Sequence, residues 1–371
     1  MNTIIRTFLP LAMAGVLSGC GGSDATTASA TAPSPPATAA SYSVGGTVSG
    51  LTGGSLTLAN NGADPIVIGA DGAFKFDSEV ASGGHYDVTV SAEPTDLSCK
   101  VISGSGSNVT AAITSIAVQC SVPQIDQFSL PFDAAGIVVD SADNLFITAG
   151  STVGLYEKAA GATGLLSVAT GVSAPAGLGI DSGNNLYISE LDNGNVYELS
   201  SGVTTQLAPT TALHADNITA DAAGDVFVVG YGYNTVYKIA AGSSSASLVT
   251  EAIADPVDVT VDLSGNLFVV SVSGTLYEIP VGTSTPVVFP PTAHLQISEA
   301  VVGGDGTIYV AAGLTDNNIT IYKIPPGSSN PTLVSLGTAS LGFPGGMAID
   351  SSGHLFITDS QATNLIEVVS P

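Results

Sequence analysis

A short pattern of polar and apolar positions recurs along the last two thirds of the chain. In the copy at residues 262–269, an aspartate is followed by a turn of small and polar residues and then by an apolar run. Apolar runs that flank such a turn predict a β-hairpin. Six copies occur, and they begin at Asp140, Asp181, Asp221, Asp262, Gly303 and Asp350. A period of about 40 residues is typical of a repeat protein, so the sequence predicts six similar units.

Each repeat continues with two further apolar segments. The first contains a tyrosine in five of the six copies, as in Val236–Ile239, and the second follows a glycine-containing turn, as in Ser247–Val249. Each complete repeat therefore predicts four short antiparallel strands, which is the content of one β-propeller blade. The sixth repeat stops at Pro371 after three strands, and Gln127–Phe132 has the pattern of the missing outer strand. The sequence thus predicts an all-β fold with a six-bladed propeller over residues 122–371, closed by an N-terminal strand that leaves no open blade edge.

Two residue types recur at fixed places in the repeats, and we assign both to the fold. The aspartate that opens five copies is predicted to cap backbone N–H groups of the hairpin turn. The tyrosine of the third strand is predicted to pack between blades, because a ligand site would not recur in every unit. These tyrosines are Tyr156, Tyr197, Tyr237, Tyr277 and Tyr322.

Between residues 42 and 121 the pattern changes to short alternating strands separated by turn signals such as Asn61-Gly62. Seven strands are expected, at Tyr42–Leu51, Ser55–Ala59, Ile66–Gly69, Ala73–Phe76, Tyr86–Ser91, Cys99–Ser103 and Ile113–Cys120. Short strands at this spacing predict a small β-sandwich. The opening segment, Tyr42–Leu51, resembles the Ig-like spacer modules of exported bacterial lipoproteins. That resemblance implies a spacer or adhesion domain and no chemistry.

Two of the three cysteines, Cys99 and Cys120, lie in this region. An even pair in an exported, oxidising compartment is expected to form a disulfide. By the chain-entropy model, closing the intervening loop of about 21 residues contributes about 3 kcal/mol. A zinc or redox role would need further Cys or His at ligand spacing, and none is near in the sequence.

The start of the chain predicts an export signal and a tether. Residues 1–19 have an apolar stretch and then small residues before Cys20, which is typical of a secretory signal peptide. Leu17-Ser18-Gly19-Cys20 resembles the cleavage box of bacterial lipoproteins, which implies lipidation of Cys20; an ordinary secretory signal is the alternative. Residues 20–41, rich in Ala, Thr, Ser and Pro, are predicted to be a flexible linker. Gly21 in place of Asp implies, by the same resemblance, an outer-membrane location, either periplasmic or surface-exposed.

The charge balance limits the partners. Without its signal peptide the chain keeps five lysines, no arginine and all 31 Asp and Glu residues, a formal charge of −26. Since no guanidinium group is available for bidentate contacts, nucleic acids and anionic sugars are poor candidate ligands. Cationic or neutral partners remain, although solubility alone also explains the acidity. We expect a monomer that is held at the membrane by its lipid.

The first strands of the repeats contain the candidate site, because these strands line the central channel of a propeller. Their third position is glycine in repeats one, two and six, but Asn217, Asp258 and Glu299 in the three adjacent repeats. Three oxygen-bearing side chains on one side of the channel mouth can hold Ca²⁺ or bind a hydroxylated or cationic ligand. A water-filled channel without a specific function is the alternative.

The repeats resemble NHL-repeat propellers, which share a Pro-x-Gly start of the first strand and an Asp-x-x-Gly-Asn turn. Pro175–Gly177 and Pro344–Gly346 show the first feature, and residues 262–266 show the second. The resemblance covers about residues 125–371 and implies a fold but no activity, since propellers host binding modules, lyases and lactonases. Gluconolactonase-type propellers are similar in blade number, but of their metal-ligand positions only Asp216 matches here, which counts against a metal lactonase.

Further residues near the channel mouth are secondary candidates. Asp216 directly precedes Asn217, and Tyr231 and Tyr233 are suited to form an aromatic platform for a sugar or a peptide. A plain loop position is an equally good explanation for the two tyrosines. His214 and His294 precede first strands and are candidate ligands or bases, but two histidines in polar loops are more often simply exposed.

Two functions are consistent with these features. The first is a non-enzymatic cell-envelope protein whose propeller binds a peptide, glycan or protein partner. The second is a hydrolase or lyase that acts in the channel mouth with a divalent cation, for which Ca²⁺ is the candidate, held by Asn217, Asp258 and Glu299. No other cofactor is expected.

Overall fold

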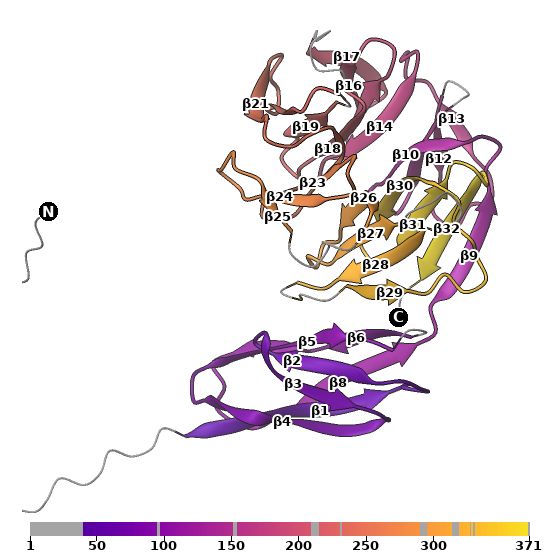
Figure 1. The fold of residues 1–371 in the computed structure, drawn as a ribbon. Coiled ribbons are helices and arrows are strands. Elements are labelled where there is room, and N and C mark those ends of the chain that lie inside the picture. The colour runs from indigo at the N-terminus through magenta and orange to yellow at the C-terminus, as the bar shows by residue number, and fades with distance from the viewer. Residues whose placement is uncertain are drawn as a thin grey trace, which may run out of the picture. The chain divides into compact units, whose positions relative to one another are not determined.

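The computed structural model describes residues 40–94, 97–150, 154–208, 215–230, 232–289, 295–313, 319–326, 328 and 331–369. Within these ranges the chain forms eight four-stranded sheets and no helix, which confirms the predicted all-β class (Figure 1). Accordingly, none of the described segments is a helix long and apolar enough to span a bilayer. The predicted signal peptide, Cys20 and nearly all of the predicted linker lie outside the described residues.

The N-terminal module consists of two sheets around one core. The first sheet has the order β4-β1-β8-β6 and the second β3-β2-β5-β7. The strands are β1 (Ser41–Ser49), β2 (Leu56–Asn60), β3 (Ala63–Ile68), β4 (Gly72–Ala81), β5 (His85–Ala92), β6 (Ser98–Ile102), β7 (Ser105–Ser107) and β8 (Ile113–Ser121). Side chains of both sheets, among them Leu56, Phe76 and Ile116, are buried in a shared cluster. The expectation of seven strands is wrong by one, because the Ser-Gly-Ser sequence of β7 has no apolar alternation.

Cys99 and Cys120 form the predicted disulfide at directly opposed positions of β6 and β8. Both side chains belong to the buried core of the module. Replacing both with alanine should lower the free energy of unfolding of the module by about 3 kcal/mol, because the unfolded chain regains the freedom of the cross-linked loop. Urea unfolding followed by circular dichroism checks this, with reduced wild type as the matched control. Equal midpoints for oxidised wild type and variant would contradict it.

Residues beyond the sandwich form six further sheets, one for each predicted repeat. In the first five sheets the strands pair in chain order. The first two sheets contain β10 (Ala134–Val139), β11 (Leu145–Ala149), β12 (Leu155–Lys158) and β13 (Leu166–Val168), then β14 (Pro175–Ile180), β15 (Leu186–Glu190), β16 (Asn195–Ser200) and β17 (Val203–Ala208). The next three contain β18 (Asn217–Ala220), β19 (Val226–Val229), β20 (Val236–Ile239) and β21 (Ala246–Thr250), β22 (Pro256–Val261), β23 (Leu267–Ser271), β24 (Leu276–Ile279) and β25 (Val287–Val288), and β26 (Ile297–Val302), β27 (Ile308–Ala312), β28 (Thr320–Ile324) and β29 (Thr332–Val334). The four-strand content predicted for each complete repeat is therefore confirmed.

The repeated aspartates hold the first turn of their sheets. Asp140 Oδ1 accepts hydrogen bonds from the backbone N–H groups of Ala142 and Asn144, each at 2.8 Å. The same pattern recurs at Asp181, Asp221, Asp262 and Asp350. The predicted capping role is confirmed, and it explains why the turn keeps its aspartate while the residues around it vary.

Buried apolar clusters join neighbouring sheets. One cluster contains Phe268 of β23 and Val310 of β27, and Tyr322 packs against it. Another contains side chains of β19 and β23, and Tyr277 packs against that one. These two recurring tyrosines thus pack between sheets, as predicted.

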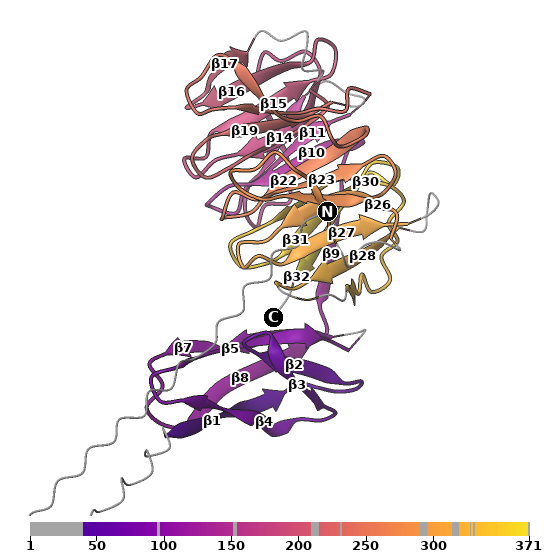
Figure 2. The same cartoon turned by 60° about the vertical axis from the view of Figure 1, so that its left-hand side comes forward.

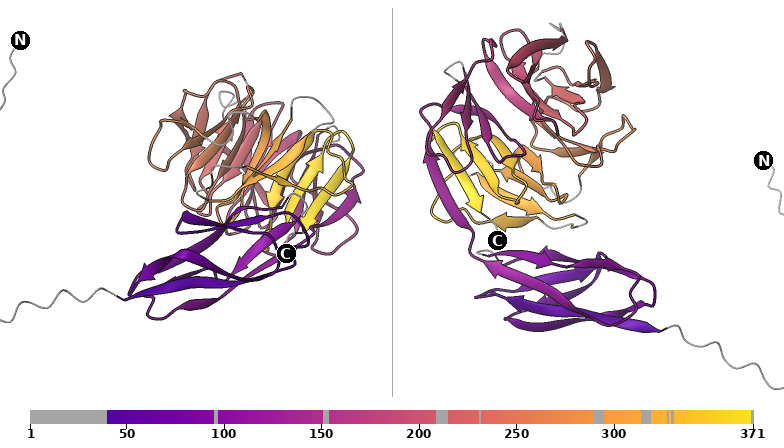
Figure 3. Two further views of the ribbon diagram at one scale, coloured as in Figure 1. Left: turned by 60° about the horizontal axis from the view of Figure 1, so that its bottom comes forward. Right: turned by 180° about the vertical axis from the view of Figure 1, so that it is seen from behind.

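The sheet of the last repeat takes its outer strand from ahead of the first repeat. It contains β30 (Pro344–Ile349), β31 (Leu355–Asp359) and β32 (Asn364–Val369), and β9 (Gln124–Ser129) pairs antiparallel with β32 (Figure 3). The predicted strand, residues 127–132, overlaps β9 only in its first half. Beyond β9 the apolar residues serve as core instead, since Phe132 is buried and its ring stacks on Tyr156 with 4.4 Å between centroids.

The first strands of the six sheets contact one another in a ring around a central channel, and β10 contacts both β14 and β30. Figure 2 shows the sheets from the side, with β10 next to β14. The close approach of β30 to β10 requires a glycine at position 345, because the backbones leave no room for a side chain there. A Cβ atom on Gly345 would lie 2.0 Å from the carbonyl oxygen of Ala134. The first and last repeats are therefore in direct backbone contact at the channel.

Candidate functional site

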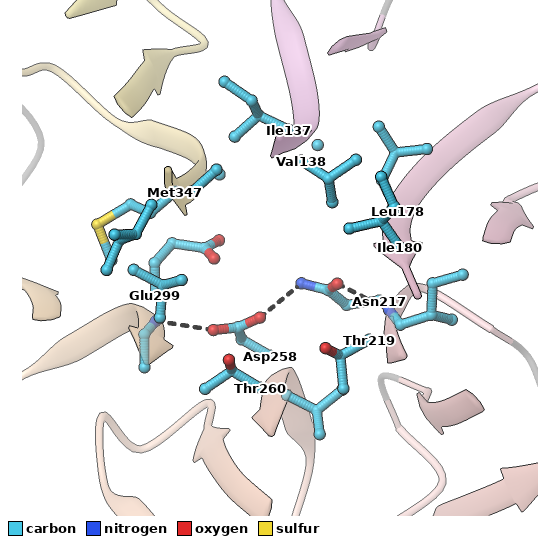
Figure 4. A pocket seen from close by; sticks show the side chains of 18 of the residues that line it. Ile137, Val138, Leu178, Ile180, Asn217, Thr219, Asp258, Thr260, Glu299 and Met347 are labelled. Carbon is cyan, nitrogen blue, oxygen red and sulfur yellow. Dashed lines mark hydrogen bonds between the residues drawn. The ribbon is translucent and has the colours of Figure 1, made fainter. Parts of the chain in front are cut away.

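The channel contains a cavity of about 180 Å³ with two unlike sides (Figure 4). Its polar side is formed by three adjacent strands, β18, β22 and β26, with Asn217, Thr219, Asp258, Thr260 and Glu299. The facing side is apolar and consists of Ile137, Val138, Leu178, Ile180 and Met347. The three polar residues singled out by aligning the repeats thus come together in one cavity.

Asn217 and Asp258 are bonded to each other and to the backbone. Asn217 Nδ2 donates a hydrogen bond to Asp258 Oδ1 at 2.8 Å, while Asn217 Oδ1 accepts one from the N–H of Ile218 at 2.7 Å. Asp258 Oδ2 accepts a hydrogen bond from the N–H of Ala300, also at 2.8 Å. The Asp258 carboxylate therefore bridges β18 and β26, and both of its oxygens already have a donor.

The Glu299 carboxylate does not connect neighbouring strands in the way that the Asp258 carboxylate does. Among the described residues, no donor lies within hydrogen-bond distance of its carboxylate. Burial raises the pKa of Asp258 to about 6, although the N–H groups of Ala300 and Val259 oppose this. Burial, together with the nearby charge of Asp258, raises the pKa of Glu299 well above its usual range. The pair of carboxyl groups therefore retains protons at a pH where exposed carboxyl groups have lost them.

Two threonine hydroxyls extend the polar side. Thr219 and Thr260 lie two residues beyond Asn217 and Asp258, so each pair shares one face of its strand. Thr260 is only 8% exposed, and in the part of the chain that the structure describes neither hydroxyl has a hydrogen-bond partner. Every fully buried side-chain nitrogen and oxygen of the described residues has a partner, so these two hydroxyls are open to the cavity. Both face the cavity in Figure 4, where a ligand can reach them.

The other repeats use the same strand positions for packing. In repeat one, Gly136 donates its N–H to the hydroxyl of Thr148 at 2.8 Å, and that hydroxyl donates to the carbonyl oxygen of Ala176 in the next sheet. A Cβ atom on Gly136 would lie 2.7 Å from the same carbonyl oxygen, so the position requires glycine. Repeat two has the equivalent arrangement.

Repeats three to five lack the second-strand hydroxyl that Thr148 provides in repeat one. Val229, Val270 and Ala311 occupy the equivalent positions. Asp258 then makes the contact to the next sheet through the N–H of Ala300. Glu299 makes no equivalent hydrogen bond to any described residue. Since the fold does not use the Glu299 carboxylate, Glu299 is the strongest candidate for contact with a ligand.

Of the other predicted site residues at the channel mouth, the structure describes only Asp216 and Tyr233. Tyr231, His214 and His294 lie outside the described residues. Asp216 and Tyr233 are described, but neither is among the residues that line the cavity. Asp216 directly precedes Asn217, and neighbouring positions along an extended chain point in opposite directions. Tyr233 is 48% exposed in a loop. The described lining of the cavity thus lacks Asp216 and Tyr233 and includes Thr219 and Thr260, which were not predicted.

The predicted calcium ligands, Asn217, Asp258 and Glu299, line the same cavity, but they offer few oxygens to a metal ion. The described residues contain no group of three or more His, Cys, Asp or Glu side chains that could hold a metal ion. The side-chain oxygen of Asn217 is occupied by the N–H of Ile218. Because Ca²⁺ takes six to eight oxygens, the carboxylates of Asp258 and Glu299 would have to be supplemented by hydroxyls and water.

Glu299→Gln is expected to raise the melting temperature by a few degrees at pH 8. A carboxyl group with a higher pKa in the folded state binds its proton more tightly there, so its stabilising contribution is complete at low pH and is lost as the pH rises through the folded pKa. Glutamine keeps the shape and has no proton to lose. The difference should vanish near pH 4, and Glu278→Gln on β24 is the matched control. A variant less stable than wild type at pH 8 would contradict the assigned effect of burial.

No family model matches the chain, and no curated protein matches it either. Solved structures do. A Bacteroides thetaiotaomicron protein of unknown function superposes with a TM-score of 0.57 at 10% identity, over 85% of this chain and 90% of that one. A Xanthomonas campestris gluconolactonase superposes with a TM-score of 0.54 at 12% identity, over 68% and 91%. Virginiamycin B lyase from Staphylococcus aureus gives 0.50 at 11% identity, over 67% and 100%. Likenesses at such identities establish the β-propeller fold, and the activity has to be argued from the site.

Proposed function

We propose that this chain is a binding protein of the bacterial cell envelope whose propeller channel receives the ligand. The observation that supports this best is the two-sided cavity, in which the Glu299 carboxylate and the hydroxyls of Thr219 and Thr260 have no hydrogen-bond partner among the described residues. Binding pockets commonly combine an apolar lining with a few converging polar groups. With a volume of about 180 Å³, the cavity admits a small molecule, or one side chain or substituent of a peptide, glycan or protein partner.

The rest of the chain fits a protein that presents this propeller at a membrane. In the proposal, Cys20 carries the lipid, residues 20–41 form the tether and the sandwich serves as an Ig-like spacer at the outer membrane. Fractionation of cells after labelling with a radioactive fatty acid tests the anchor. Label should follow the wild type into the outer membrane, and Cys20→Ser should be unlabelled. Labelled Cys20→Ser protein would refute the assignment.

A channel-filled variant tests the binding site. Thr219→Phe places a large side chain inside the cavity, whereas Thr205→Phe on the outer strand β17 adds the same group away from it. A thermal-shift screen of small molecules should give compounds that stabilise the wild type and the outer-strand variant but not Thr219→Phe. Compounds that stabilise all three proteins equally, or none that stabilises the wild type, would count against the channel as the site.

A hydrolase or lyase that uses a divalent cation is the second candidate. The observation that favours it is the pair of carboxyl groups, Asp258 and Glu299, with raised pKa values and no cationic side chain among the described residues that line their cavity. Calorimetric titration with Ca²⁺ tests this candidate. Binding that Asp258→Ala abolishes would support it, and the absence of both heat and thermal shift in the wild type would remove it.

A further inference from the structure

We propose that the ligand of the channel is a short primary alkylammonium ion, or a partner group that ends in one. This inference rests on the proposed binding function and specifies the chemistry of the same site. It follows from three properties of the cavity: the sign of its charge, the number of acceptors that are not used by the fold, and the apolar character of its far wall.

The charge of the cavity is negative. Of the described residues that line it, Asp258 and Glu299 are the ones that titrate, and none of them is Lys, Arg or His. A ligand that carries one positive charge compensates a carboxylate there, and it replaces the proton that burial otherwise retains on the pair. An anionic ligand would meet like charge from two sides.

The available acceptors suit an ammonium group better than a divalent metal ion. A primary ammonium group has three N–H donors and no acceptor. The cavity offers the Glu299 carboxylate and the hydroxyls of Thr219 and Thr260, none of which has a partner among the described residues. Thr260 is the independent indication, because the residue is largely buried and neutral, while its hydroxyl opens into the cavity and has no hydrogen-bond partner among the described residues. Ca²⁺ would need six to eight oxygens, and the side chains of the apolar side supply none.

The apolar wall selects the remainder of the ligand. Ile137, Val138, Leu178, Ile180 and Met347 face the polar side across the cavity (Figure 4). Methylene groups placed against them leave water, whereas a polyhydroxylated ligand would lose hydrogen bonds there. A volume of about 180 Å³ corresponds to about six water molecules at 30 Å³ each. Pentylammonium, with six non-hydrogen atoms, is therefore a suitable probe.

Binding of this cation should depend on pH in a defined direction. Alkylammonium ions stay protonated below about pH 10, as lysine does, so only the site titrates between pH 5 and 8. With the pKa of Asp258 raised to about 6 and that of Glu299 raised as well, protons compete with the ligand at low pH. The affinity should therefore be weaker by about tenfold or more at pH 5 than at pH 8.

Calorimetric titration of the full chain with pentylammonium chloride tests the inference. We expect a dissociation constant of about 1 mM or tighter at pH 8, loss of binding in Glu299→Gln, and unchanged binding in Glu278→Gln. 1-Pentanol, which has the same tail and no charge, should bind at least about tenfold more weakly. Equal affinity for pentanol, unchanged binding in Glu299→Gln, or no binding of pentylammonium would each overturn the inference.

The result also separates this inference from the function on which it rests. If pentylammonium fails while Ca²⁺ or a screened neutral compound binds to wild type and not to Thr219→Phe, the channel remains the binding site and only the ligand class is wrong. If no compound distinguishes wild type from Thr219→Phe, both proposals fail.

Discussion

Proline at one of the adjacent positions Asp126 and Gln127 is expected to destabilise the propeller by about 3 kcal/mol, while proline at the other is expected to be nearly neutral. Both residues are exposed on β9, the outer strand of the last sheet, and lie opposite Glu367 and Ile366 of β32. In an antiparallel edge strand, successive N–H groups point alternately toward the partner strand and toward solvent. One substitution therefore removes a hydrogen bond between the ends of the propeller, and the other does not.

Chemical unfolding of the two variants provides its own control, because both introduce the same residue into the same strand. The destabilised variant should also show faster amide exchange in residues 364–369, since β32 loses part of its only outer neighbour. Two variants as stable as wild type would show that the pairing of β9 with β32 does not support the propeller.

Glu190→Ala is expected to lower the free energy of unfolding by about 3 kcal/mol, because several donors would lose a charged acceptor at once. Glu190 is 3% exposed at the end of β15. Its carboxylate accepts hydrogen bonds from the N–H and hydroxyl of Ser173, from the side chains of Asn193 and Asn195, and from the hydroxyl of Tyr197. The network ties the segment before β14 to the turn after β15.

The pH dependence of Glu190 runs opposite to that of Glu299. Burial alone would raise its pKa, but the hydrogen bonds from Ser173, Asn193 and Asn195 lower it to about 2. A carboxyl group with a lowered folded pKa contributes stability above its ordinary pKa and loses it as the pH falls toward 2. Wild type and Glu190→Ala should therefore differ most at pH 7 and converge in acid, with Glu157→Ala on β12 as control. A difference that does not shrink below pH 4 would contradict this.

The number of repeats, their four strands and the turn aspartates could be predicted because each is repeated in the sequence. Comparison of equivalent positions also identified Asn217, Asp258 and Glu299, since a polar residue is conspicuous where the other repeats have glycine. The same comparison two residues further on would have found Thr219 and Thr260, which stand where the other repeats have Val, Gly or Ala. That signal was present in the sequence and was missed.

Other features depend on three-dimensional contacts that no repeat position encodes. Glu190 is indistinguishable from a surface glutamate until the loop residues around Ser173 and Asn193 fold over it. The predicted outer strand extended too far toward the C-terminus, because Leu130 and Phe132 are as apolar as strand residues. Both are instead buried in the cluster between the first and last sheets. The direction of the Asn217 amide, which decides how many oxygens face the cavity, follows from the N–H of Ile218 and is likewise invisible in the sequence.

The pairing of β9 with β32 sets the order in which this protein can fold. Residues 124–129 are synthesised well over 200 residues before their partners at residues 364–369. Contacts so distant in sequence form slowly, because the intervening chain must be closed into a loop first. Until residues 364–369 are available, β9 has no partner strand, so chaperones have a long interval in which to act. A chain that lacks these residues would never end that interval.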